Sequence, residues 1–300
     1  MGKGRGYVVK ITNKLNLPQA FVSMAESDYQ YKEKQYSVTT MLKGLKEMIL
    51  ERRYHGETEQ DVADMIWMLF GQAAHHILEQ SQESETEFKE EYLIVDMSNG
   101  YKLSGRLDLY CGKTKTVTDY KTCSVWSIIY QDFDKWKMQL LMYAWMLRRY
   151  GFECNKGEVV AIMKDHSKTK AKVDSSYPQL PVQRVTFSFT EQDFEYIDNY
   201  LQCRFAEIEE LEKLSDNNIP HCSLEERWNK GNTYAVTKKG NKKAKRVLND
   251  EAEAQAMSEQ LGNDYFVAVR PGEDKKCAEY CRVNSHCDYW QKQMKVSEAI

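Results

Sequence analysis

The sequence predicts an α/β protein whose core elements follow the order helix, three strands, helix, strand. Three observations predict this order. Apolar residues recur at helical spacing between residues 59 and 83 and again between residues 132 and 150, while residues 86 to 123 alternate as strands. Residues 158 to 165 (EVVAIMKD) form a nearly continuous apolar run, which is typical of a buried strand.

Composition allows one large domain, or one domain with elaborations, in 300 residues of which 42% are hydrophobic. The net charge of −3 does not indicate a nucleic-acid binder, so such a protein would have to concentrate positive charge locally. No apolar run approaches the ~20 residues that span a membrane. The first ten residues lack the apolar core of a signal peptide, so we expect a cytoplasmic protein.

The first elements can be placed from their end signals. Residues 1–36 are expected to be an irregular segment with a short strand near residues 7 to 11. One helix should begin after Ser37, a plausible N-cap, and run to about residue 53. A second, largely buried helix should cover residues 59 to 83. Gly71 within it costs ~1 kcal/mol relative to alanine, which indicates close packing.

The segment 105–123 (GRLDLYCGKTKTVTDYKTC) predicts two strands around a turn at residues 111–113. Asp108 falls within the first strand, and Asp119 and Lys121 fall in the second, two residues apart and therefore on one face. If the strands pair, two carboxylates and one ammonium converge. Converging oxygen ligands suit Mg²⁺ or Mn²⁺. The alternative is a solvated hairpin face without chemistry.

Two flanking motifs favour a metal-dependent active site over a solvated hairpin face. Residues 71–79 read G-x-x-x-H-x-x-L-E, with His75 and Glu79 on one helix face, and Gln139 and Tyr143 form Q-x-x-x-Y on a later helix. Together with G-x-x-D and D-x-K in the hairpin, these motifs resemble the RecB-like exonuclease group of the PD-(D/E)XK nuclease superfamily. The resemblance covers about residues 37 to 165.

That resemblance implies a restriction-endonuclease-like αβββαβ core with a mixed central sheet flanked by helices, spanning residues 37–215. It implies a Mg²⁺- or Mn²⁺-dependent deoxyribonuclease, with exonuclease favoured over endonuclease, from a phage or a bacterial recombination system. The implied partners are DNA and a single-strand annealing or recombination protein, in a bacterial or phage-infected host cell. The alternative is a catalytically silent DNA-binding module or a structural subunit of a recombination complex.

Residue roles follow from the same resemblance. The implied metal ligands are His75, Asp108, Asp119 and the backbone carbonyl of Tyr120. Lys121 would position the attacking water or stabilise the transition state. Gln139 and Tyr143 would line the DNA groove and hydrogen-bond the phosphate backbone or Lys121, and Glu79 would reach the metal through water or bond nearby.

The C-terminal part continues the α/β pattern. After a polar loop at residues 166–181, a strand at residues 182–189 precedes a long helix opened by Thr190 and Asp193. Four glutamates of that helix, at positions 207, 209, 210 and 212, are expected to form a solvated face. Residues 227–246 hold eight lysines or arginines and no acidic residue, with a turn at residues 239–241. A DNA-binding hairpin would use Lys238, Lys239, Lys242 and Lys243. The alternative is a solvated basic loop.

Residues 216–300 are expected to pack on the core as a cysteine-containing elaboration. Cys277, Cys281 and Cys287 follow the spacing C-x3-C-x5-C, and Cys222 is the candidate fourth ligand. Some RecB-type nucleases close with a [4Fe–4S] cluster, although they usually place the first cysteine before the nuclease motifs, and this chain has none before Cys111. The alternatives are Zn²⁺, with His221 or His286 as a further ligand, and free thiols.

Overall fold

The computed structural model of the chain describes residues 10–25, 31–80 and 86–298, apart from the side chains of Glu79 and residues 296–298. It divides into two compact units. Unit 1 comprises Met1–Lys43 with Arg52–Leu214, and unit 2 comprises Gly44–Glu51 with Ser215–Ile300. The strand expected near residues 7 to 11 lies partly outside the described residues. Among the described helices, none is both long enough and apolar enough to cross a membrane.

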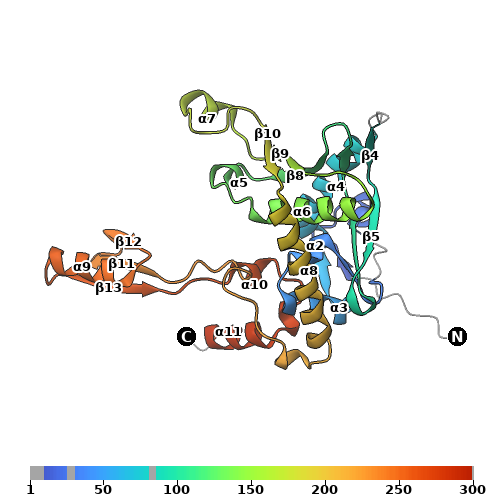
Figure 1. Ribbon diagram of the computed structural model, residues 1–300. Coiled ribbons are helices and arrows are strands. Elements are labelled where there is room, and N and C mark those ends of the chain that lie inside the picture. Colours follow the sequence, from blue (N-terminus) through green and yellow to red (C-terminus); the bar gives the residue numbers. More distant parts are fainter. Residues whose placement is uncertain (1–9, 26–30, 81–85, 299–300) are drawn as a thin grey trace. The chain divides into compact units, whose positions relative to one another are not determined.

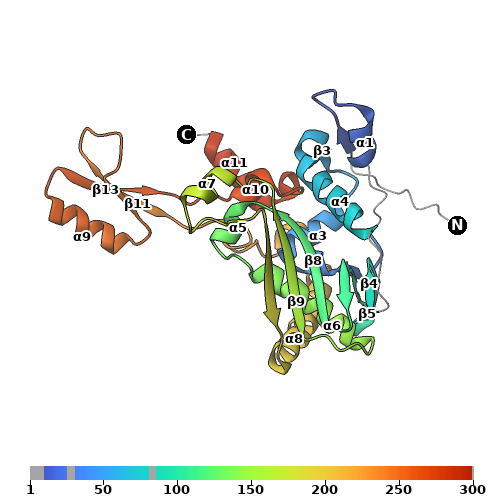
Figure 2. The same cartoon turned by 90° about the horizontal axis from the view of Figure 1, so that it is seen from above.

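Unit 1 is built on a five-stranded mixed sheet in the order β10-β9-β8-β7-β4 (Figures 1 and 2). Its strands are β4 (Glu87–Lys89), β7 (Leu109–Cys111), β8 (Thr116–Cys123), β9 (Lys156–Met163) and β10 (Val182–Ser188). β8 and β9 run parallel, and every other pair in this sheet is antiparallel. A parallel pair needs a crossover, which here contains α5 (Val125–Ile129) and α6 (Asp134–Arg149).

Helices flank this sheet. α6 contacts β8 and β9, and α8 (Glu191–Leu211) contacts α6 on its other side (Figure 1). α6 is therefore buried continuously from Gln139 to Leu147. α4 (Ile66–Glu79) contacts β8, and a Cβ on Gly71 would lie 3.2 Å from Oγ1 of Thr122, which is the close packing that the sequence indicated. The mixed sheet with its helices confirms the predicted fold class.

Unit 1 also contains a smaller, three-stranded sheet in the order β2-β6-β5. This sheet consists of β2 (Gln35–Ser37), β5 (Tyr92–Asp96) and β6 (Lys102–Arg106), with β2 and β6 parallel. A Cβ on Gly105 would lie 2.6 Å from the ring of Tyr143, so only glycine lets β6 approach α6 this closely. Beyond β6 the chain changes sheets and enters β7. In addition, β1 (Lys10–Thr12) pairs in parallel with β3 (Glu59–Asp61).

Several local expectations were wrong. The helix expected over residues 37–53 breaks into α2 (Val38–Met41) and α3 (Leu45–Arg53), and residues 59–65 form β3 and a 3-10 turn before α4. The polar loop expected at residues 166–181 contains a short helix, α7 (Lys168–Val173). Glu212 is half-buried rather than on a solvated face, because its carboxylate accepts hydrogen bonds from the hydroxyls of the buried Tyr36 and Tyr101. The segment 1–36, expected to be irregular, contains α1 (Gln19–Ala25) among its described residues.

Unit 2 contains a three-stranded antiparallel sheet in the order β12-β11-β13, against which α9 (Glu251–Leu261) packs. The strands are β11 (Thr233–Lys238), β12 (Arg246–Leu248) and β13 (Tyr265–Arg270), so the predicted turn at residues 239–241 does join two paired strands. Two further helices are α10 (Lys275–Glu279) and α11 (Asp288–Glu298). Lys46, which is 1% exposed, donates to the carbonyls of Asp216 and Ile219 and to Oδ1 of Asp288.

Candidate active site

Asp119 and Lys121 lie on one face of β8, as their spacing predicts. Nζ of Lys121 is 3.1 Å from Oδ1 and 2.8 Å from Oδ2 of Asp119. Oδ1 also accepts a 2.8 Å hydrogen bond from Nε2 of Gln139 on α6. Asp119 is 4% exposed, and burial raises the pKa of its carboxyl, with the nearby Asp108 carboxylate adding to the rise and Lys121 opposing it. A cation bound here would relieve that cost.

The sequence suggested that Asp108 lies inside a strand. In the structure it lies at the break between β6 and β7. The break frees its side chain to turn toward β8. Its Oδ2 accepts a 2.7 Å hydrogen bond from the backbone N–H of Tyr120. The carboxylate is thereby fixed beside the residue that separates Asp119 from Lys121.

His75 approaches the same carboxylate from α4. Its Nδ1 lies 3.4 Å from Oδ2 of Asp108, and its ring meets that of Tyr120 edge-on. The hydrogen bond with Asp108 raises the pKa of His75, burial opposes the rise, and the backbone of Tyr120 contributes to it. His76 is exposed, and the side chain of Glu79 lies outside the described part of the chain.

Glu90 completes this group, and sequence reasoning missed it. One ligand atom each from His75, Glu90 and Asp108 lies within 4.8 Å of the other two. Glu90 follows β4 with a positive φ of 51°, a conformation uncommon for a glutamate, and its N–H donates to the carbonyl of Asp108 at 3.2 Å. The left-handed turn thus holds Glu90 against the strand break that carries Asp108.

The donor set fits a divalent cation. Two carboxylates and an imidazole nitrogen suit Mn²⁺ and, through the oxygens, Mg²⁺. In addition, Oδ2 of Asp119 is a buried oxygen that accepts no hydrogen bond from any described residue, and the Lys121 ammonium lies 2.8 Å from it. An oxygen of this kind is stabilised by a cation. His75, Glu90 and Asp108 could therefore hold the metal, with Asp119 as a further candidate carboxylate on the neighbouring strand.

A sequence model of the PD-(D/E)XK nuclease superfamily matches residues 19–288. The chain belongs to the PD-(D/E)XK nuclease superfamily. This confirms the resemblance drawn from the three motifs, and the family supports a metal-dependent nuclease that acts on DNA. No curated protein matches the chain.

Solved structures similar to this PD-(D/E)XK protein include three with low identity. SSO0001 is 17% identical with a TM-score of 0.42, and the match covers 60% of this chain and 80% of that one. LHK-Exo in complex with dAMP is 13% identical with a TM-score of 0.37, covering 59% and 89%. A phage-related exonuclease from Haemophilus somnus 129PT is 12% identical with a TM-score of 0.30, covering 58% and 80%.

The sequence suggested that Gln139 and Tyr143 line the DNA groove, but both side chains are buried in the structure. They are 6% and 4% exposed, respectively. Gln139 donates to Asp119 rather than facing solvent. Burial raises the pKa of the Tyr143 phenol, and its ring packs against Gly105. Both side chains therefore support the site from behind.

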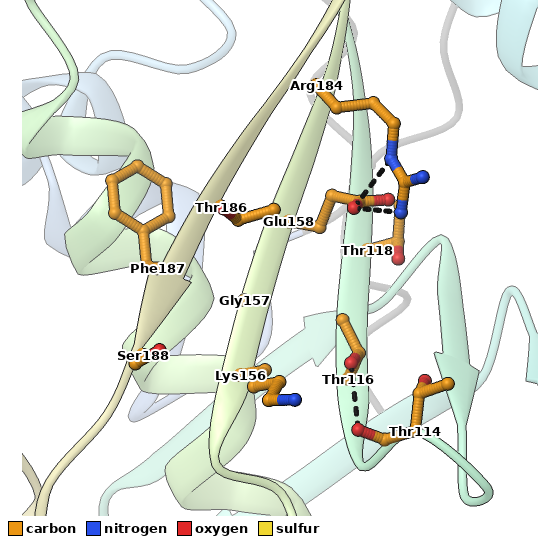
Figure 3. Close-up of a pocket in the computed structure, with 10 residues that line it drawn as sticks. All are labelled: Thr114, Thr116, Thr118, Lys156, Gly157, Glu158, Arg184, Thr186, Phe187 and Ser188. Atoms are coloured by element: carbon orange, nitrogen blue, oxygen red, sulfur yellow. Dashed lines mark hydrogen bonds and ion pairs between the residues drawn. The ribbon is translucent and has the colours of Figure 1, made fainter.

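A cavity of about 460 Å³ lies elsewhere on the nuclease sheet, over β8, β9 and β10 (Figure 3). Its lining is dominated by threonines and by Glu158, whose carboxylate accepts two hydrogen bonds from the Arg184 guanidinium. None of the four candidate metal-binding side chains lines it. The cavity is therefore separate from the carboxylate site.

The four late cysteines line one small cavity of about 30 Å³ in unit 2. Burial raises the pKa of Cys222 to about 11 and those of Cys277 and Cys281 to about 12, and neighbouring carboxylates and thiols add to these rises. A Cβ on Gly44 would lie 2.9 Å from Sγ of Cys222, so the start of α3 closes tightly over this thiol. Three of these thiols, Cys222, Cys277 and Cys281, would be costly to ionise without a cation. Four thiols around one cavity are a suitable donor set for a soft metal.

Proposed function

We propose that this PD-(D/E)XK protein is a Mg²⁺- or Mn²⁺-dependent exodeoxyribonuclease of the RecB-like group, working in DNA recombination or phage replication. The observation that carries the proposal is the convergence of His75, Glu90 and Asp108 within 4.8 Å beside the Asp119–Lys121 pair. A module that only bound DNA would not need this combination of converging carboxylates and an ammonium. The exonuclease assignment is supported by the G-x-x-x-H-x-x-L-E and Q-x-x-x-Y motifs.

The proposed ligands are the side chains of His75, Glu90, Asp108 and Asp119, together with the backbone carbonyl of Tyr120. A bound Mg²⁺ or Mn²⁺ supplies Lewis acidity and a lowered pKa for water at neutral pH. The side chains of this chain do the rest. Asp108, held by the Tyr120 N–H, and Asp119, held by Gln139, keep their oxygens in fixed directions, so little reorganisation is needed when substrate binds.

Lys121 is the proposed catalytic cation. Its side chain is 27% exposed, and its Nζ lies against the buried Asp119. From this position the ammonium can orient the attacking water and stabilise the extra negative charge of the phosphorane-like transition state. It cannot ligate a metal, because it has no acceptor.

The test is a nuclease assay with Mn²⁺ on linear duplex, closed circular duplex and single-stranded DNA. We expect linear DNA to be degraded, closed circles to survive, and all activity to disappear in EDTA. Cleavage of closed circles at the same rate would make the protein an endonuclease. No cleavage of any substrate by a metal-loaded protein would favour the silent DNA-binding or structural subunit.

Unit 2 has two proposed roles. Cys222, Cys277, Cys281 and Cys287 are proposed to hold a [4Fe–4S] cluster, with Zn²⁺ as the rival, in a structural centre whose four protein ligands leave no open position. The exposed Lys238, Lys239, Lys242 and Lys243 around the β11–β12 turn are proposed to contact DNA phosphates. The proposed protein partner is a single-strand annealing or recombination protein.

A further inference from the structure

We propose that an exposed edge of unit 1, at the ends of β8 and β9, binds the unpaired bases and phosphates of a single-stranded DNA segment. We call it the aromatic–lysine edge, and it consists of Trp67, Trp126, Tyr130, Lys164, Lys168, Lys170 and Lys172. The inference deepens the nuclease function proposed above and rests on it. It names unpaired DNA as the form of substrate that reaches the site.

Large aromatic rings are exposed along this edge. Trp126 and Tyr130 on α5 stack on each other, with ring centroids 5.6 Å apart and an interplanar angle of 23°. They are 48% and 70% exposed, respectively. Trp67 on α4 is 59% exposed, and Nζ of Lys164 lies 4.2 Å from the centroid of its ring. Exposed rings in a cluster mark a surface that meets a ligand.

Positive charge accompanies the rings. Lys164, Lys168, Lys170 and Lys172 are all exposed, and all lie within nine residues at the end of β9 and in α7. Two carboxylates lie in or beside this run. Asp165 accepts hydrogen bonds from Oγ of Ser124 and the N–H of Val125, and Asp174 accepts from Ser176. Four lysines against two aspartates leave the segment with net positive charge.

The edge is continuous with the proposed active site. β8 and β9 are parallel neighbours, so α5 and the Lys164–Lys172 segment follow strands that end at the same side of the sheet. The two segments are joined directly, because the N–H of Lys164 donates to the carbonyl of Cys123 at 3.0 Å. Cys123 is two residues beyond Lys121. The edge therefore meets β8 two residues from the proposed catalytic ammonium, so a DNA strand bound there lies close to the proposed active site.

Unpaired DNA fits this chemistry better than a protein partner does. Bases can stack on the exposed rings while phosphates pair with the interleaved lysines. A duplex keeps its base faces stacked on one another, so it could use the lysines but not the rings. An apolar protein surface would cover the rings only by also removing the lysine ammonium groups from water, which is costly.

The test is fluorescence anisotropy with the full-length protein in EDTA, so that no substrate is cleaved. Three labelled ligands of equal length are compared: an oligo(dT) strand, the same strand with a central run of abasic sites, and a blunt duplex. The variant is Trp126→Ala/Tyr130→Ala. The matched control is Tyr196→Ala, which removes an exposed α8 tyrosine that stacks on Tyr200 with a centroid distance of 6.3 Å and an angle of 24°.

We expect wild type and Tyr196→Ala to bind oligo(dT) more tightly than the abasic strand. We expect the double variant to lose about tenfold or more in affinity for oligo(dT) and to stop discriminating against the abasic strand. Its affinity for the blunt duplex should change by less than about twofold. A triple variant, Lys168→Gln/Lys170→Gln/Lys172→Gln, should reduce the salt dependence of oligo(dT) binding by up to about 2 in log–log slope.

Two results would overturn the inference. The first is an unchanged oligo(dT) affinity in the double variant. The second is an equal loss for the strand and the duplex. If the first result comes with a shift in oligomeric state by size-exclusion chromatography, the edge is a protein interface. If the wild type cleaves DNA and one of these results is found, only the edge inference fails. If the edge binds oligo(dT) as expected but the metal-loaded wild type does not cleave DNA, only the nuclease proposal fails.

Discussion

Nε2 of Gln139 on α6 donates a 2.8 Å hydrogen bond to Oδ1 of Asp119 on β8, and both side chains are buried. The same oxygen receives the ammonium of Lys121. These two donors fix the direction of the carboxylate and leave Oδ2 without a hydrogen bond among the described residues. Helix α6 thus sets the orientation of a proposed metal ligand that it does not itself provide.

Gln139→Leu should therefore weaken metal binding without removing a ligand. Loss of a side chain that orients a ligand typically costs 10–100-fold in metal affinity or activity, and we expect a loss of about that size. Calorimetric titration with Mn²⁺ measures it. Gln202→Leu is the control, since Gln202 bonds to Asp198 on the exposed face of α8. Equal Mn²⁺ affinities for the wild type and Gln139→Leu would contradict the positioning role.

Lys121→Met should lower the cleavage rate by about 10²-fold or more, because it removes the proposed cation that stabilises the transition state. Mn²⁺ affinity should stay close to that of the wild type, since an ammonium is not a ligand. Rate and affinity are measured on the same preparation. Lys137→Met, which removes an ion pair between Lys137 on α6 and Asp193 on α8, should keep normal turnover. Turnover near the wild-type rate in Lys121→Met would exclude the assigned role.

Glu90→Gln tests the residue that the structure adds to the site. Replacing a carboxylate by an amide removes one negative ligand, so Mn²⁺ affinity and cleavage should both fall, as they should in Asp108→Asn. Glu91→Gln is a closely matched control, because its side chain is exposed one residue further along. If Glu90→Gln and Glu91→Gln behave alike, the metal is held without Glu90.

The proposed [4Fe–4S] cluster at the four cysteines should make the purified protein coloured. We expect anaerobically purified protein to be brown with broad visible absorbance, and Cys281→Ser to lose both colour and solubility. Cys203→Ser should keep both, because Cys203 is exposed on α8. Colourless protein with stoichiometric Zn²⁺ would move the assignment to zinc, and freely titrating thiols at all four positions, without metal, would end it.

The Lys46–Asp288 pair predicts acid sensitivity in unit 2. Burial acts to raise the pKa of Asp288, but hydrogen bonds from Lys46 and His221 outweigh it and hold the pKa well below its usual range. A depressed folded-state pKa contributes stability above the unfolded value of ~3.9, and that contribution is lost as the pH falls below it. The free energy of unfolding should therefore decrease below about pH 4, and less steeply in Asp288→Asn.

Lys46→Met should be destabilising at neutral pH. It leaves two backbone carbonyls and a carboxylate without their buried donor, and breaking a buried pair typically costs about 3–5 kcal/mol. Urea unfolding at pH 7 measures the change, with the surface variant Lys292→Met as the control for charge. Equal stability of Lys46→Met and wild type would show that the pair is not structural.

Local patterns in the sequence determined much of this protein. The two-residue spacing of Asp119 and Lys121 places them on one face of β8, because side chains alternate along any strand. The Thr190–Asp193 capping box and the turn at residues 239–241 depend only on neighbouring residues, and both are present. The motifs around them were sufficient to identify the superfamily.

Tertiary structure alone decided which distant residues meet. Glu90 joins the site because the chain changes sheets at Asp108 and a left-handed turn returns Glu90 to that break. Gln139 faces Asp119 instead of DNA because α6 is enclosed between the sheet and α8. The aromatic–lysine edge exists because β8 and β9 are parallel neighbours. Periodicity reports which face a side chain occupies, but strand order and packing determine what that face meets.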